Sequence, residues 1–153
     1  MACLNPVPSL MEFRDEPGEA AFLEQALLAD LHAANRQACN SRLTLTLRDG
    51  DRIVAGIDGT TAYGWLLIKV LWVDTSLRGR QIGRGLVDRA IGIARTRGCH
   101  GAWLDTSDPG ARVFYRKLGF VPFGTLANEQ GQPCETHRRW FMRRDIDTCL
   151  EQG

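Results

Sequence analysis

The amino-acid sequence predicts an α/β fold with a mixed, mostly antiparallel sheet and flanking helices. In its first half, apolar residues alternate with polar ones at the two-residue period of β-strands. In its second half, helical apolar patterns alternate with short apolar segments. A length of 153 residues fits one domain over residues 1–153, and 44% apolar with 24% charged residues is ordinary globular composition.

The first predicted element is a helix over residues 19–38. Its apolar residues recur at helical spacing, at Phe22, Leu23, Ala26, Leu27, Leu31 and Ala34. The ten residues before Met11 contain two prolines and leave room for one short strand. A helix that precedes the strands is therefore expected to flank the sheet.

Three strands in an antiparallel meander are expected next. Residues 43–47 alternate Leu with Thr, as in a half-buried strand. Residues 48–51 form the turn, in which Gly50 supplies a positive φ, and residues 53–57 return. Residues 63–73 are apolar almost throughout, which favours a central strand buried on both faces.

The second half predicts a helix over 82–94, with Gly98 as its C-cap, and a strand over 99–104. A strand, a helix and a strand in this order imply a parallel crossover.

A further helix begins with Asp108 as N-cap and Pro109 in its first position, and it stops at Gly119. Strands over 120–123 and 139–146 follow, joined by a loop over 128–136.

A loop between the third strand and its following helix has the chemistry of a phosphate site. The start of a helix has unpaired backbone N–H groups, and glycines let the backbone approach an anion closely. Arginines nearby add charge and donate hydrogen bonds in pairs, so the loop favours a pyrophosphate ligand. The candidate residues are Arg78, Gly79, Arg80, Gln81, Ile82, Gly83 and Arg84. A solvated strand-to-helix turn is the alternative. The loop lacks the ending of a Walker A motif and the spacing of a dinucleotide motif.

Residues 111–120 read A-R-V-F-Y-R-K-L-G-F. With the phosphate loop, this segment resembles the GCN5-related N-acetyltransferase (GNAT) superfamily, as a small bacterial-type member. The resemblance extends over about residues 19–146 and is strongest over 71–124. The family's coenzyme A signature is Arg or Gln, two residues, Gly, one residue, then Gly or Ala. Here Arg78 and Gly83 match, while Gln81 replaces the first glycine.

The resemblance implies the GNAT fold, acetyl-CoA as co-substrate and no metal. It implies that two adjacent strands separate at a bulge and that main-chain groups near Leu71 and Val73 bind the pantetheine arm there. It also implies that the acceptor amine attacks the thioester directly while Tyr115 protonates the departing thiolate. Asp108 stands where the family often has an Asn that contacts the coenzyme.

The residue that takes the proton from the amine is left open. Many relatives use a Glu on the strand before the phosphate loop, and this strand has none. Asp74 is the nearest carboxylate, His137 can titrate near neutral pH, and solvent is the third possibility.

The expected partner is a small-molecule or peptide amine, and a homodimer is possible because relatives often dimerise. A net charge of +1 argues against nucleic acid, and the lack of 18 consecutive apolar residues argues against a membrane span. Five cysteines without a CxxC pair suggest reduced thiols and a cytoplasmic location.

Two other functions are weighed. The first is a non-catalytic acyl-CoA binder or sensor, suggested by Gln81 and the missing Glu. The second is a nucleic-acid-binding domain, suggested by arginine clusters such as the one formed by Arg138, Arg139, Arg143 and Arg144.

Overall fold

The computed structural model describes residues 11–36 and 40–147. Their helices are α1 (Ala20–Ala34), α2 (Ile82–Thr96) and α3 (Pro109–Lys117), with short 3-10 turns η1 (Pro17–Glu19) and η3 (Thr75–Leu77). The strands are β1 (Ser41–Asp49), β2 (Arg52–Ala62), β3 (Trp65–Val73), β4 (Gly101–Thr106), β5 (Val121–Ala127) and β6 (Arg138–Asp145). The predicted α/β class is confirmed, while the short strand proposed for the first ten residues lies outside the described ones.

The six strands form one sheet in the order β1-β2-β3-β4-β6-β5. β1, β2 and β3 are the expected antiparallel meander, and Gly50 has the positive φ of +57° that its turn requires. The next turn was not predicted. Tyr63 was assigned to the third strand but has φ 53°, followed by Gly64 at φ 79°. A two-residue hairpin loop with positive φ at both residues matches the twist of the strands, and β3 therefore begins at Trp65.

β3 and β4 are the parallel pair, and they stay together only briefly. Residues Trp65–Leu67 pair with Gly101–Trp103, after which the strands separate. Just beyond, the pairing of β3 with β2 shifts by one residue, because Gly59 faces Ile68 whereas Asp58 faces Val70. The extra residue on β3 is Lys69. The strand separation and bulge expected from the family resemblance are thus confirmed.

The prediction that the third strand is buried on both faces is wrong. Leu66 and Ile68 are buried, but Val70 is 54% exposed and Trp72 is 45% exposed. The exposed part follows the point where β4 leaves, so it has lost one neighbouring strand. Burial along a strand depends on these neighbours, which an apolar run does not reveal.

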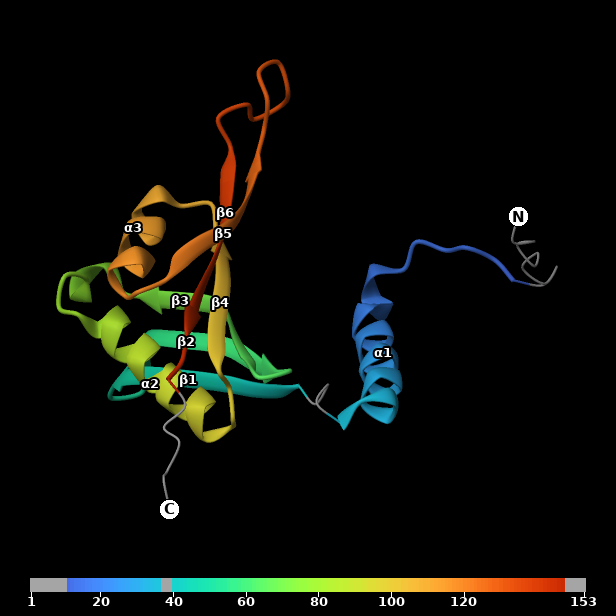
Figure 1. Ribbon diagram of the computed structural model, residues 1–153, viewed down its shortest axis with the longest axis horizontal. Helices are drawn as coiled ribbons and strands as arrows, with labels where there is room; N and C mark the ends of the chain where they lie inside the picture. Colours follow the sequence, from blue (N-terminus) through green and yellow to red (C-terminus); the bar gives the residue numbers. More distant parts are fainter. Residues whose placement is uncertain (1–10, 37–39, 148–153) are drawn as a thin grey trace.

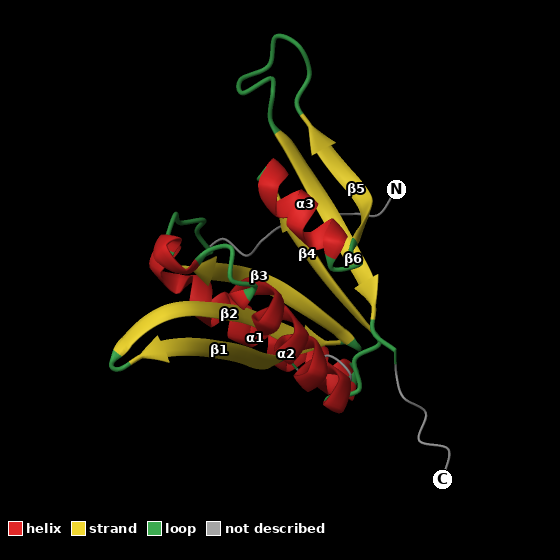
Figure 2. Ribbon diagram, turned by 90° about the vertical axis from the view of Figure 1, so that its left-hand side faces the viewer, coloured by secondary structure: helices red, strands yellow, loops and turns green. Residues whose placement is uncertain are grey.

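Helices α2 and α3 cover one face of the sheet (Figure 2). The core lies beneath them and includes Phe120, Leu104, Met142 and Val87. By contrast, α1 stands apart from the sheet on the opposite side (Figure 1), and none of its residues is buried. No helix among the described residues is long and apolar enough to cross a membrane.

The local helix signals were read correctly except for the position of one C-cap. Asp108 is the N-cap of α3, since its carboxylate accepts a hydrogen bond from the Gly110 N–H at 2.9 Å. Gly98, with φ +82°, follows the C-cap Arg97 of α2 rather than being the C-cap itself. The strands after α2 are longer than or shifted from their predicted ranges, because side-chain patterns locate strand ends poorly.

Candidate functional site

The loop between β3 and α2 is held by a capped turn. Asp74 caps η3 by accepting hydrogen bonds from the N–H and the hydroxyl of Ser76, at 3.0 and 2.9 Å, and it also pairs with Arg52. The Arg78 Nε donates to the Val73 carbonyl at 3.2 Å. These bonds fix where the chain leaves β3 and where the loop begins.

Gln81 is the N-cap of α2 and adopts a left-handed conformation, with φ 61° and ψ 20°. Glycine is the residue that normally takes this conformation without cost. Gln81 therefore has the backbone shape of the glycine that it replaces, and its side chain makes no capping hydrogen bond. Gly79, at φ +78°, supplies a second left-handed residue in the same loop.

The predicted phosphate-loop residues come together at the start of α2. The first turn of a helix leaves N–H groups without intrahelical acceptors, here those of Ile82, Gly83 and Arg84, and it carries a partial positive charge. The side chains of Arg78, Arg80 and Arg84 are all exposed around this turn. Arg84 lies 3.9 Å from Asp88, one turn along the helix. The arrangement suits a polyanion.

Gly83 joins this loop to the other two predicted parts of the site. A Cβ built on Gly83 would lie 3.4 Å from the Phe114 ring and 3.8 Å from the Leu71 side chain. The start of α2, the end of β3 and helix α3 therefore meet at this point. Leu71 and Val73 are half-buried against the core here, on the stretch of β3 that has no β4 partner. The main-chain N–H and C=O groups on that edge form no hydrogen bonds with a neighbouring strand of the described sheet.

Tyr115 is buried on α3 between two aromatic rings. Its ring is edge-on to Phe114, with centroids 5.0 Å apart, and edge-on to Phe120 at 5.4 Å. The residue is 6% exposed, and burial raises the pKa of Tyr115 to about 12. The phenol therefore stays protonated near neutral pH, where its hydroxyl can donate a hydrogen bond or a proton.

Arg112 is a residue that the sequence analysis did not single out. Its guanidinium lies over the Trp140 ring, 4.9 Å from the centroid, and its buried Nε has no hydrogen-bond partner in the described structure. A buried donor without an acceptor is costly and suggests an absent partner. An oxygen-rich acyl-coenzyme A would supply acceptors, so this donor and the cationic loop both fit such a ligand. No spacing rule marks Arg112, since it occupies a variable position of its motif.

The two candidate bases lie in different surroundings. The hydrogen bonds from Ser76, followed by the charge of Arg52, hold the pKa of Asp74 below its usual range. Asp74 is thus a structural cap and a weak base. His137 lies in the loop before β6, where its carbonyl accepts from the Asn128 N–H at 3.1 Å.

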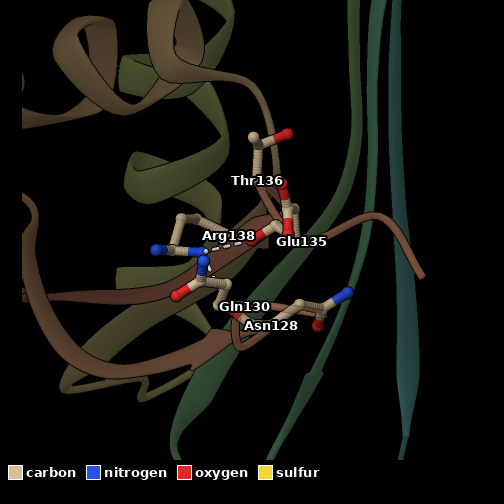
Figure 3. Close-up of a pocket in the computed structure, with 5 residues that line it drawn as sticks. All are labelled: Asn128, Gln130, Glu135, Thr136 and Arg138. Atoms are coloured by element: carbon tan, nitrogen blue, oxygen red, sulfur yellow. Dashed lines mark hydrogen bonds between the residues drawn. The ribbon is translucent and has the colours of Figure 1, made fainter. Parts of the chain in front are cut away.

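Two surface pockets of the described chain contain none of the predicted site residues. One, of about 500 Å³, lies in the β5–β6 loop and is lined by Asn128, Gln130, Glu135, Thr136 and Arg138 (Figure 3). Arg138 donates there to the carbonyls of Asn128, Glu135 and His137, which ties the loop together. The other pocket, of about 670 Å³, is lined by residues that include Ser41, Arg97 and His100.

The late arginine cluster does not form one basic surface. Arg139 pairs with Asp105 at 2.9 Å, Arg144 donates to the Leu118 carbonyl at 2.9 Å, and Arg143 lies 5.9 Å from the Trp65 ring. Alternation along β6 places Arg139 and Arg143 on one face and Arg144 on the other. Neutralised or divided arginines make a poor nucleic-acid surface.

Comparisons with known proteins agree with this architecture. Residues 7–120 match the model of the acetyltransferase (GNAT) family. An acetyltransferase of Agrobacterium fabrum is 40% identical over 85 residues, which cover 55% of this chain and 62% of that protein. The blasticidin-S acetyltransferase of Streptomyces morookaense is 36% identical over 69 residues, 44% of this chain and 51% of that protein. The matched segments thus span about half to three-fifths of these relatives.

Solved structures extend the match to nearly the whole chain. A crystal structure assigned to an acetyltransferase from Agrobacterium tumefaciens superposes with a TM-score of 0.73 at 31% identity, and the match covers 93% of this chain and 99% of that one. Together with the match of residues 7–120 to the family model, this coverage identifies the chain as a member of the acetyltransferase (GNAT) family.

Proposed function

We propose that the protein transfers the acetyl group of acetyl-CoA to a primary amine, by direct attack within a ternary complex. The observation that carries the proposal is the convergence of the cationic start of α2, the unpaired edge of β3 and helix α3, which carries Tyr115. Each part alone has a structural explanation. Gly83 lies near Leu71 of β3 and near Phe114, whose ring contacts that of Tyr115, and a coenzyme A thioester site requires these three elements to lie together.

The start of α2 would bind the pyrophosphate. The N–H groups of Ile82, Gly83 and Arg84 point along the helix axis toward the loop, and the helix dipole favours an anion there. Arg78 and Arg80 add charge at the rim. The left-handed Gln81 offers its own N–H without needing to be glycine. Asp108 keeps its capping role, and its main chain is the part free to contact the coenzyme.

The unpaired edge of β3 would bind the pantetheine arm through main-chain groups at Leu71 and Val73. A strand edge without a ladder partner offers N–H and C=O groups in a row, although the Val73 carbonyl already accepts a hydrogen bond from Arg78. An N–H at this edge would also polarise the thioester carbonyl, as an oxyanion hole does. The acetyl thioester supplies the electrophilic carbon, and no covalent enzyme intermediate is needed.

Tyr115 would donate its proton toward the leaving sulfur and would regain a proton from solvent. The amine loses one proton as the C–N bond forms, and the sulfur gains one as the C–S bond breaks. Burial keeps the Tyr115 hydroxyl protonated, which is the state that a donor needs. Because the carboxylate of Asp74 is already bonded and its pKa is lowered, we assign removal of the amine proton to solvent.

The acceptor class is proposed as a small-molecule or peptide amine. The blasticidin-S acetyltransferase similarity supports placing small-molecule amines first in any panel. A non-catalytic acyl-CoA binder remains the competing proposal, since β3 carries no Glu.

The test compares the wild type with Tyr115→Phe, which keeps the ring and removes only the hydroxyl. Calorimetry should give equal acetyl-CoA affinities, while kcat for the amine substrate should fall about 10²-fold or more, in the range of general acid catalysis. Tyr63→Phe, at the exposed tyrosine, is the control. Equal kcat values for Tyr115→Phe and wild type would exclude Tyr115 as the proton donor.

A further inference from the structure

Helix α1 carries a continuous apolar surface that its own chain leaves in solvent. Phe22, Leu23 and Leu27 are 68%, 65% and 58% exposed, and Leu31 is 37% exposed. Leu23, Leu27 and Leu31 are four residues apart, so they form one stripe along the helix. Such a stripe is normally buried in a contact.

The sheet has an apolar face opposite α2 and α3 that is partly uncovered. Strand alternation and the pairing register place six large apolar side chains there, which we call the open strip: Trp65, Leu67, Val70, Trp72, Trp103 and Phe141. Val70 and Trp72 are the most exposed of them. The strip runs along β3 and, at Trp65 and Leu67, continues across β4 to β6. There the three strands are about 10 Å across, which matches the width of a helix with its side chains.

We propose that the protein is a homodimer in which each copy lays its α1 on the open strip of the other. The proposal concerns assembly and does not depend on the proposed acetyl transfer. Helix α1 stands apart from the sheet within one chain (Figure 1). In the dimer, the apolar stripe of α1 and the open strip would each be covered by the other copy.

The surroundings of α1 favour a second copy over its own sheet. The strand that follows α1 is β1, and the outward side chains of β1 and β2 are polar there. Arg42 and Thr44 both donate to the Asp58 carboxylate, at 3.0 to 3.1 Å and 2.6 Å. The hydrogen bond to Asp58 and its charge raise the pKa of Arg42, and the charge of Glu24 makes a smaller contribution, so Glu24 of α1 lies near this polar network. The segment before α1 leads farther away, with Phe13 95% exposed.

Charge complementarity supports the same pairing. The described residues of α1 and its N-cap carry Glu19, Glu24 and Asp30 and no Lys or Arg. Lys69 lies at the bulge of β3 beside the open strip, and Arg143 lies near Trp65. Hydrogen bonds from Thr44 and Arg42 lower the pKa of Asp58, and the charge of Lys69 adds a smaller contribution. When an acidic helix packs on an apolar strip with basic residues at its rim, apolar burial stabilises the centre of the contact and opposite charges stabilise its edges.

Reciprocal exchange also doubles the area of the interface. The contact forms twice about a two-fold axis, so each helix–strip contact needs to bury only about 800 Å², counted over both surfaces, to reach the ~1,600 Å² typical of stable interfaces. Because Val70 and Trp72 border the separation of β3 from β4, the partner's α1 would also lie beside the proposed transfer site.

The test uses two variants of the full chain that damage opposite sides of the contact. The helix variant carries Leu23→Glu and Leu27→Glu, and the strip variant carries Val70→Glu and Trp72→Glu. Leu47→Glu is the control, since Leu47 is 40% exposed on β1 and lies outside the strip. Circular dichroism checks that each folds, and Val70→Glu alone replaces the strip variant if the double substitution does not.

Light scattering should give twice the chain mass of 17.0 kDa, 34.0 kDa, for the wild type and the Leu47→Glu control. The helix and strip variants should each be monomeric alone. Mixed together, they should form a heterodimer in native mass spectrometry, because one exchanged contact then joins an intact helix to an intact strip. A monomeric wild type, a variant that still dimerises alone, or mixed variants that form no heterodimer would each overturn the proposal.

Discussion

Replacing Gln81 by glycine should stabilise the protein. Gln81 is held at φ 61°, where an L-residue with a Cβ costs about 1–2 kcal/mol relative to a right-handed conformation. Glycine removes that cost but loses roughly 0.5–1 kcal/mol through its greater freedom in the unfolded chain. The net gain in the free energy of unfolding is about 0.5–1 kcal/mol. For a domain of this size, that corresponds to a rise in Tm of roughly 2–3 °C.

The measurement is thermal unfolding followed by circular dichroism, with Gln81→Ala as the matched control. Alanine keeps the Cβ and therefore the backbone strain, and nothing is lost with the amide because the Gln81 side chain makes no capping bond. Gln81→Ala should melt at or slightly below the wild type, and Gln81→Gly above both. A glycine variant no more stable than the alanine variant would refute the reasoning that Gln81 occupies a strained glycine position.

Three further predictions concern the same site. First, the free energy of unfolding should fall by about 2.7 kcal/mol as the pH rises through 10 to 12, because folding raises the pKa of Tyr115 from 10.0 to about 12. This stabilisation is complete below pH 10. In urea titrations, Tyr115→Phe should remove the loss of stability, whereas Tyr63→Phe should not. Second, Asp108→Ala should cost about 1 kcal/mol in the free energy of unfolding and Asp108→Asn much less, since only alanine loses the cap to Gly110; equal losses in urea titrations would contradict this capping role. Third, Arg84→Ala should weaken acetyl-CoA binding in calorimetry by about tenfold, because a charged hydrogen-bond donor is lost. Arg95→Ala, at the other end of α2, is the control and should not weaken binding. Equal effects of the two substitutions would contradict a pyrophosphate site at the start of the helix.

The elements that the sequence predicted well are those set by local chemistry. Gly50 requires a left-handed turn and Asp108 caps a helix whatever the rest of the chain does, and both were placed correctly. The period of apolar residues likewise located α2 and the meander.

What the sequence could not supply depends on contacts between distant segments. The turn at Tyr63 was missed because a tyrosine is an unusual residue at φ 53°. The exposure of Val70 and Trp72 follows from where β4 leaves the sheet, which no property of β3 reveals. The lack of a hydrogen-bond partner for the buried Nε of Arg112 could not be predicted, because it depends on how α3 packs beside Trp140.

The central claim is the transfer of an acetyl group to an amine. The most direct measurement is the release of free coenzyme A thiol from acetyl-CoA, followed with a panel of small-molecule and peptide amines, after calorimetry has established that acetyl-CoA binds. The account predicts thiol release that saturates with one class of amine and an acetylated amine in equal amount by mass spectrometry. Saturable acetyl-CoA binding with no amine-dependent release across the panel would contradict the transferase proposal and favour the non-catalytic binder.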